Sequence, residues 1–182
     1  LKHVRSEEEI DSIKYMLLTN SETFLNLRKN EKTYLKKVFS VSTDKSVNPS
    51  SILGISKYLM EQKLAQLKTQ KKKLFVSSTR FANVSFSNGS ILKNIIDKIN
   101  KRKIFGIPNK IKRYYITHEE ASSLCFKSLL SKNDGCIVVP SKEILIDQKT
   151  IKYLCEKIFK MMKISVKFRK KITKNTSPTK KF

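Results

Sequence analysis

Residues 38–57 of this chain read VFSVSTDKSVNPSSILGISK. Apolar and polar residues alternate over 38–42, which is the pattern of a short, half-buried strand. The strand is expected to end in the polar cluster Thr43-Asp44-Lys45, and Pro49 then marks a turn. Ser50 or Ser51 can cap a following helix. The apolar residues of that helix recur at helical spacing: Ile52, Ile55, Leu59, Leu64 and Leu67.

A second strand-like run follows this helix. Residues 71–73 form a lysine turn, and residues 74–77 read Leu-Phe-Val-Ser, a composition typical of strands. A strand, a helix and a second strand joined by a crossover of this length are typical of two parallel strands in one sheet. The middle of the chain therefore predicts an α/β fold.

Further helices and strands are predicted on both sides of this unit. Two segments have the spacing of a capping box and should each open a helix, namely Ser6-Glu7-Glu8-Glu9 and Thr117-His118-Glu119-Glu120. The turn Ser87-Asn88-Gly89-Ser90 should cap another helix. Short apolar runs predict strands at 113–116, 136–139 and 144–146, and an amphipathic pattern predicts a last helix over 151–162.

The charge of the chain raises the question of a polyanionic partner. The 182 residues carry a net charge of +24, with a pI near 10.0. Such a charge is typical of proteins that bind nucleic acid or acidic membranes. Most lysines, however, are dispersed singly among the predicted helices, and no aromatic residues are interleaved with them as a stacking platform. We therefore do not expect a nucleic-acid partner, although a basic nucleic-acid-binding module stays open as an alternative.

Cysteine usage and hydropathy limit other classes. The three cysteines, Cys125, Cys136 and Cys155, are scattered and form no CxxC or Cys/His spacing. The sequence therefore predicts neither a metal site nor a disulfide framework, and it indicates a reducing, cytoplasmic location. No apolar run approaches the roughly 20 residues that a membrane-spanning helix needs, so we expect no membrane span.

The polar cluster after the first strand is where an open α/β sheet places its chemistry, because ligands bind beyond the carboxyl ends of parallel strands. Asp44 and Lys45 are adjacent, so we expect them to point in different directions and to be able to serve as an acid and a base. Lys57 lies in the first turns of the next helix and can turn back toward the strand ends. A purely structural interpretation stays open, with Asp44 as a turn or capping residue and the two lysines as solvated charges.

Residues 42–57 resemble the active-site segment of the polysaccharide-biosynthesis branch of extended short-chain dehydrogenases/reductases, which includes UDP-N-acetylglucosamine 4,6-dehydratases. Four further segments are similar to that family and follow its order. Residues 1–4 resemble the end of its fourth strand, residues 80–84 its substrate-contacting segment, and residues 87–90 and 111–117 its sugar-nucleotide loops. The resemblance covers roughly residues 1–140.

The resemblance implies a partial Rossmann-like parallel sheet and a 4,6-dehydratase reaction. In that family NADP or NAD oxidises the sugar at C4, a base removes the C5 proton, an acid assists loss of the C6 hydroxyl, and hydride returns to C6. By position, Asp44 would be the acid and Lys45 the base, and Thr43 or Ser42 would hydrogen-bond the C4 hydroxyl. The remaining implied contacts are Lys57, Ser42 and Lys2 for the cofactor and Asn83, Ser90 and Arg113 for the UDP-sugar substrate.

Two departures from the family pattern affect this interpretation. Leu53 occupies the position where most short-chain dehydrogenases carry a proton-accepting Tyr, four residues before Lys57. No GxxGxxG or GxGxxG loop for the dinucleotide phosphates occurs in the sequence, and the first residue is Leu1 rather than Met. We therefore expect a truncated chain or one half of a split enzyme, stable only marginally by itself and binding NADP weakly.

The expected organisation has three parts. Residues 1–84 would form the second half of an NAD(P)-binding domain with the active-site segment, residues 85–162 a small α/β substrate-binding region, and residues 163–182 a basic tail. The resemblance also implies homo-oligomerisation of the complete enzyme and, as a possible partner, a separately encoded amino-terminal half. The alternatives to a dehydratase are a related epimerase or reductase, a non-catalytic remnant, and the nucleic-acid-binding module.

Overall fold

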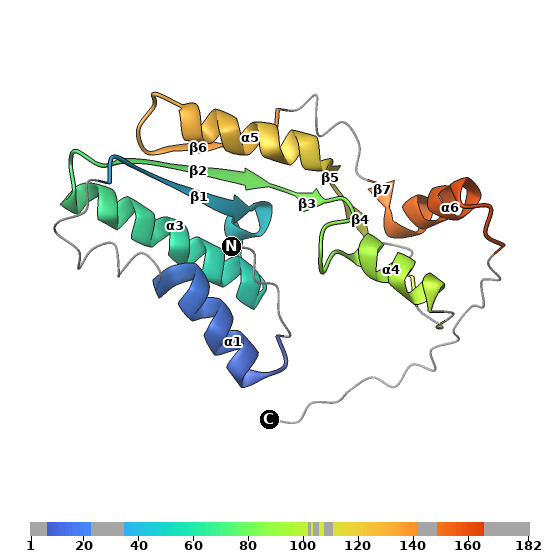
Figure 1. Ribbon diagram of the computed structural model, residues 1–182. Coiled ribbons are helices and arrows are strands. Elements are labelled where there is room, and N and C mark those ends of the chain that lie inside the picture. Colours follow the sequence, from blue (N-terminus) through green and yellow to red (C-terminus); the bar gives the residue numbers. More distant parts are fainter. Residues whose placement is uncertain are drawn as a thin grey trace.

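The computed structural model describes residues 7–22, 35–101, 103, 106–107, 111–141 and 149–165. Its main feature is a three-stranded parallel sheet in the order β1-β2-β6, with helices on both faces (Figure 1). A second group of short strands and helices lies beyond one end of this sheet (Figure 1). The predicted α/β class with a partial Rossmann-like parallel sheet is confirmed.

The strand–helix–strand unit predicted around residue 50 forms as expected. Strand β1 (Lys37–Thr43) pairs in parallel with β2 (Phe75–Phe81) over their full lengths, and α3 (Ile52–Gln70) makes the crossover between them. The predicted apolar stripe of α3 is buried only in its second half, where Leu64 and Leu67 pack against the strands; Ile55 and Leu59 in the first half are 38% and 37% exposed. The apolar core between α3 and the strands is a cluster of five buried side chains: Val38, Leu64, Leu67, Leu74 and Val76.

The caps decide where the helices begin. Ser51, rather than Ser50, caps α3 by accepting a hydrogen bond from the backbone of Gly54 at 3.2 Å. The capping box of Thr117 and Glu120 opens α5 (His118–Leu130) as predicted. The prediction for the first box was wrong, because α1 (Ile10–Leu17) begins three residues later, after Glu9. The carboxylate of Glu9 accepts from the hydroxyl of Ser12 instead.

The two faces of the sheet are covered by different crossovers. Along β2, Val76 packs with α3, whereas the hydroxyl of Ser77 donates to the carbonyl of Ser128 in α5. Strand β6 (Cys136–Val138) pairs with β2 on the side away from β1. The chain thus steps twice in the same direction across the sheet, once over each face (Figure 1). The two crossovers therefore have opposite hands, and the one through α5 departs from the usual right-handed rule.

The second group contains two small sheets and two helices. Strand β3 (Asn83–Val84) pairs in parallel with β5 (Tyr115–Ile116), and β4 (Lys112–Arg113) pairs antiparallel with β7 (Lys149–Thr150). The strand predicted at 113–116 is therefore two short strands with different partners. Helices α4 (Ile91–Asn100) and α6 (Ile151–Met161) share a core of Ile95, Ile151, Cys155 and Phe159.

Some predictions lie outside the described residues, namely the strands at 1–4 and 144–146, Lys2, and most of the basic tail 163–182. The domain division at residue 84 stays a prediction. Helix α5 and strand β6 fall within the range 85–162 but pack on the first sheet. In the described part of the chain, no helix combines the length and apolar character that crossing a bilayer requires.

Gly54 provides a test of how closely α3 packs on the turn after β1. A Cβ atom at this position would lie 2.6 Å from the carbonyl oxygen of Lys45 and 3.3 Å from the Cα of Pro49. We expect Gly54→Ala to lower the free energy of unfolding by about 1–3 kcal/mol, because the backbone must shift. The measurement is urea denaturation followed by circular dichroism.

Gly106→Ala is the matched control for this substitution. A Cβ at Gly106 would meet nothing within 4 Å, so its effect should stay within about 0.5 kcal/mol. Helix propensity alone predicts the opposite result for Gly54, since Ala favours a helix interior by about 1 kcal/mol. A Gly54→Ala chain as stable as the parent or more so would contradict the close packing.

Candidate active site

The carboxyl ends of β1 and β2 place the predicted catalytic segment and the predicted substrate segment at one edge of the sheet. In the parallel register Thr43 lies opposite Phe81, and Ser42 lies opposite Arg80. The turn that begins at Asp44 therefore leaves the sheet beside the chain that continues toward Asn83. This is the edge at which open α/β sheets bind ligands.

Thr43, Asp44 and Lys45 form one local hydrogen-bonded group. Asp44–Ser46 is a single 3-10 turn, and the hydroxyl of Thr43 accepts from the backbone of Lys45 at 3.5 Å and donates to Oδ1 of Asp44 at 2.8 Å. Lys45 Nζ lies 3.2 Å from the same carboxylate oxygen. The expectation that Asp44 and Lys45 point in different directions was wrong, because the long lysine side chain bends back to its neighbour. The pair is partly open to solvent.

Lys57 is buried beneath this turn, on the first turns of α3. The residue is 6% exposed, and its ammonium donates to the carbonyl of Val41 at 3.1 Å and lies 3.7 Å from Sδ of Met60. Burial lowers the pKa of Lys57 to about 8, while the negative charge of Glu61 acts in the opposite direction. The structure therefore places a lysine with a depressed pKa against the last residues of β1.

A buried ion pair lies beside Lys57, and the sequence analysis did not identify it. Glu61 binds the guanidinium of Arg80 through two hydrogen bonds of 2.9 and 2.6 Å. Burial acts to raise the pKa of Glu61, but the hydrogen bonds from Arg80 and Ser42 and the charge of Arg80 hold it below its ordinary value. Ser46 reaches the same carboxylate at 3.0 Å. The spacing of Lys57 and Glu61, four residues apart on one helix, was the available signal.

Ser42 belongs to this inner network. Its side chain is buried, with 4% of the residue exposed, and its hydroxyl donates to Ser46 Oγ at 3.3 Å. A second buried contact, also missed, joins the π-helical turn after α1 to α3. The amide of Asn20 donates to Ser56 Oγ at 3.0 Å, and Ser56 in turn donates to the carbonyl of Leu53 at 2.9 Å.

The predicted substrate-binding residues lie in the second group of elements. Asn83 in β3 donates its side-chain amide to the carbonyl of Tyr114 at 3.1 Å, so it is held against the segment that carries Arg113. Arg113 is exposed on β4. Ser90 caps α4 by accepting from Lys93 N at 3.3 Å. Asn83 is thus held next to Tyr114, the residue that follows Arg113, whereas Ser90 serves a helix start.

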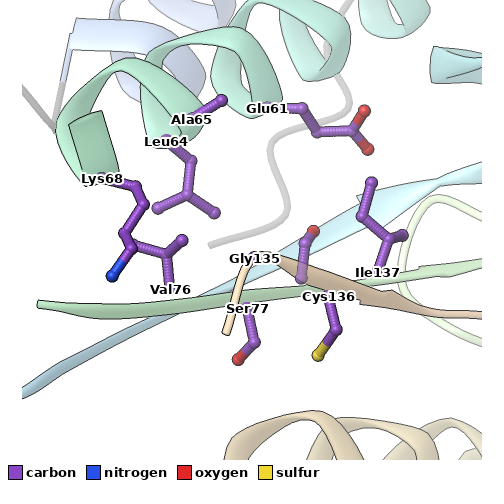
Figure 2. A pocket seen from close by; sticks show the side chains of 10 residues that line it. Glu61, Leu64, Ala65, Lys68, Val76, Ser77, Gly135, Cys136 and Ile137 are labelled. Carbon is purple, nitrogen blue, oxygen red and sulfur yellow. The ribbon is translucent and has the colours of Figure 1, made fainter. Parts of the chain in front are cut away.

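A cavity of about 180 Å³ lies elsewhere, between α3 and the strands β2 and β6 (Figure 2). Its walls are mainly apolar side chains such as Leu64, Val76 and Ile137, with Glu61 and Lys68 at its border (Figure 2). The cavity faces the amino-terminal half of β2, and Glu61, which borders it, also contacts Ser46 of the turn after β1. In the part of the chain that the structure describes, no three His, Cys, Asp or Glu side chains gather as metal ligands would.

The donors at the strand ends fit one end of a dinucleotide. An ammonium has three N–H donors, and the described acceptors of Lys57 are one carbonyl and one thioether. The remaining N–H can therefore serve a ribose hydroxyl. The phosphate-binding glycine loop of a dinucleotide site does not occur among the four glycines of the sequence, Gly54, Gly89, Gly106 and Gly135.

The fold and the site together define a Rossmann-type protein of the extended short-chain dehydrogenase/reductase class. The profile of one family, described as "Polysaccharide biosynthesis protein", matches residues 1–178. The chain belongs to this family, and the resemblance stated for residues 42–57 is confirmed at this level.

Two curated proteins and one solved structure illustrate the relationship. The chain is 30% identical over 95 residues to the capsular polysaccharide biosynthesis protein CapD of Staphylococcus aureus. The aligned region covers 52% of the chain and 16% of CapD. It is 32% identical over 123 residues to a UDP-glucose 4-epimerase of Rickettsia rickettsii, covering 65% of the chain and 35% of the epimerase. The chain thus spans well under half the length of both relatives.

The solved structure is DesIV, a dTDP-glucose 4,6-dehydratase from Streptomyces venezuelae with NAD and TYD bound. It superposes with a TM-score of 0.72 and covers 91% of this chain and 56% of the DesIV chain. The sequence identity is 14%, so this likeness shows the shared fold alone.

The depressed pKa of Lys57 makes a prediction about stability. The pKa of Lys57 is about 8 in the folded chain and 10.5 when the side chain is in water. Between these two pH values the unfolded chain binds more protons than the folded chain. Burial of the ammonium therefore destabilises the fold fully below pH 8 and progressively less as the pH rises to 10.5. We expect Lys57→Met to raise the free energy of unfolding at pH 7 by about 1–2 kcal/mol, after allowing for the lost hydrogen bond to Val41. The gain should shrink toward pH 10.5.

Urea denaturation at pH 7, 8.5 and 10 checks this expectation. Lys68→Met is the control on the same helix, because Lys68 is ion-paired with Asp134 and its removal should give no gain at any pH. A Lys57→Met chain that is less stable than the parent at pH 7 would contradict the assignment of Lys57 as a buried, strained charge.

Proposed function

We propose that this chain is the catalytic and substrate-binding half of a nucleotide-sugar 4,6-dehydratase of the UDP-N-acetylglucosamine type, serving surface-polysaccharide or glycan synthesis. One observation carries the proposal. The turn with Thr43, Asp44 and Lys45 follows the end of β1, where the carbonyl of Val41 accepts from a buried lysine, Lys57, whose pKa is lowered to about 8. An acid, an amine base and a second cation at one strand edge are the groups that an elimination next to a carbonyl requires.

The residues would divide the reaction as follows. Lys57, through its positive charge, would favour loss of the C4 hydroxyl proton, and Thr43 or Ser42 would hydrogen-bond that hydroxyl. Lys45, as a neutral amine, would take the C5 proton, and Asp44, as a carboxylic acid, would give its proton to the C6 hydroxyl, which leaves as water. The ion pair of Asp44 and Lys45 holds the opposite protonation states, so the bound sugar has to displace water from the turn and separate the two side chains.

Bound NADP or NAD would supply the hydride acceptor at C4 and the hydride donor at C6. Lys57 would hold its ribose, and the DesIV structure with NAD supports a nicotinamide cofactor by likeness of fold. Asn83 and Arg113 would hold the substrate diphosphate, Arg113 through charge-assisted hydrogen bonds. Ser90 would contact the substrate from the start of α4. The proton acceptor that replaces a Tyr at Leu53 stays open.

A 4-epimerase is the second candidate, because the related protein from R. rickettsii is named a UDP-glucose 4-epimerase. Epimerisation needs oxidation and reduction at C4 but no acid and base for elimination, so the Thr43-Asp44-Lys45 group favours dehydration. A non-catalytic remnant, or one half of an enzyme completed by a separately encoded amino-terminal half, is the third candidate.

The surface of α1 and α3 supports the expected homo-oligomer. Large apolar side chains on and next to these two neighbouring helices are exposed to solvent: Ile10 of α1 is 69% exposed, and Leu18, directly after α1, is 58% exposed. Tyr58 of α3 is 42% exposed. An apolar surface of this kind is typical of a protein–protein contact.

The decisive experiment combines the purified chain with UDP-N-acetylglucosamine and NADP, in the absence and presence of a supplied amino-terminal half that carries a glycine-rich loop. We expect a product lighter than the substrate by one water, measured by mass spectrometry. Lys45→Ala should reduce its formation by at least about 100-fold, because a general base is lost.

Lys36→Ala is the control, since Lys36 is exposed and precedes β1 at the opposite end of that strand. A product of unchanged mass but different sugar stereochemistry would establish the epimerase instead. Product that forms only with the supplied half would identify one part of a split or truncated enzyme. No product under either condition, with no uridine-nucleotide binding, would leave a remnant fold.

A further inference from the structure

The ion pair of Glu61 and Arg80 joins α3 to the carboxyl end of β2. The contact is bidentate, with Arg80 Nε to Oε1 at 2.9 Å and Arg80 Nη2 to Oε2 at 2.6 Å. The side chain of Glu61 is 6% exposed and that of Arg80 is 25% exposed. Two charges that have lost this much water stay charged only if they satisfy one another.

The same carboxylate reaches the turn of the candidate active site. Ser46, which is fully buried, has its hydroxyl 3.0 Å from Glu61 Oε1 and 2.7 Å from the carbonyl of Thr43. One hydroxyl proton serves one of these acceptors at a time, and Ser42 donates to the oxygen of Ser46. Glu61 therefore contacts a side chain of the turn that also contains Asp44 and Lys45.

Glu61 and Lys57 are four residues apart on α3 and are both buried, so they share the face that packs on the strands. Charged groups on the elements packed around α3 are largely neutralised by their own partners: Asp44 by Lys45, Arg80 by Glu61, and Glu22 by Lys63. Asp11 and Lys14 of α1 are exposed to solvent. Glu61 is the group whose charge opposes the effect of burial on the pKa of Lys57.

We propose that Glu61 is a positioning residue of this site, which keeps the buried ammonium of Lys57 charged at neutral pH and is itself held in place by Arg80 and Ser46. The use of a charged Lys57, to hold a ribose and favour deprotonation of a hydroxyl, rests on the proposed function. The interaction of Glu61 with Lys57 does not. Arg80 moderates this interaction, because its positive charge offsets part of the field that Glu61 exerts on Lys57.

The alternative is that the ion pair only fastens α3 to β2. The two roles predict opposite shifts in the titration of Lys57. If Glu61 acts on Lys57 through its charge, its removal leaves the ammonium less stabilised and moves the midpoint below 8. If the pair is only a fastener, its removal opens the site, water reaches Lys57, and the midpoint rises toward the ordinary value of 10.5.

Competitive acetylation of the folded chain measures this midpoint without any cofactor or substrate. The chain is treated with trace acetic anhydride from pH 6 to 11, digested, and the modified fraction of Lys57 is followed by mass spectrometry. We expect Glu61→Gln to lower the midpoint by about one pH unit or more, and Arg80→Met to raise it. Glu61→Asp, which keeps the charge, should stay nearer the parent than Glu61→Gln does.

Lys36, exposed beyond the opposite end of β1, is the internal reference and should titrate alike in all chains. A Lys57 midpoint that is unchanged or raised in Glu61→Gln overturns the proposal. Should that variant fail to fold, Glu61→Asp decides, because it keeps the charge but shortens the side chain that contacts Arg80, and a midpoint that rises toward 10.5 overturns the proposal. Failure to form a dehydratase product would reject the proposed function and leave this titration unaffected, so the two can fail separately.

Discussion

A buried carboxylate and a partly buried guanidinium join the elements of this protein at the carboxyl edge of its sheet. Glu61 and Arg80 meet through two hydrogen bonds, and the same carboxylate contacts Ser46. Loss of Arg80 would leave the carboxylate of Glu61 buried and unpaired, whereas the partly exposed Arg80 could still reach water if Glu61 were lost. The positions of α3, of the end of β2 and of the turn after β1 are therefore set together, and the catalytic groups proposed here depend on that common anchor.

The fold could be predicted where local chemistry and tertiary packing agree. The alternation over 38–42 and the apolar spacing over 52–67 gave the right strand and helix, because the strand and the second half of the helix bury one face in the same core, although Ile55 and Leu59 are exposed. Ser6 failed as a cap, since the side chain of Glu9 is engaged by Ser12 and the helix starts later. Residues 112–116 divide between two sheets, and no local pattern encodes which distant strand each half will meet.

The sequence predicted the exposed residues of the site but not the buried residues that hold them in place. The motif around Thr43, Asp44 and Lys45 could be found because its residues are contiguous. Glu61, Arg80 and Ser46 belong to three elements, and each alone resembles an ordinary surface or turn residue. Only the four-residue spacing from Lys57 marked Glu61 as lying on the same helix face. The contact between Asp44 and Lys45 also needed the structure, since adjacency in the chain does not show that the lysine side chain turns back onto its neighbour.

The interior beside this edge is built from hydroxyls where many parallel sheets carry Val or Ile. Ser40 and Ser78 lie opposite one another in the register and are hydrogen-bonded at 3.0 Å, while Thr79 donates to the carbonyl of Val138 at 3.0 Å. Small hydroxyl residues bury less apolar area than Val, so the sheet gains less from the hydrophobic effect. Their hydrogen bonds offset part of this loss, while the register is set by the apolar face, because a slip of one residue would turn Val38 or Val76 away from α3. Strand register at the site is thus specified by the buried apolar face, which also fixes where the turn with Asp44 and Lys45 begins.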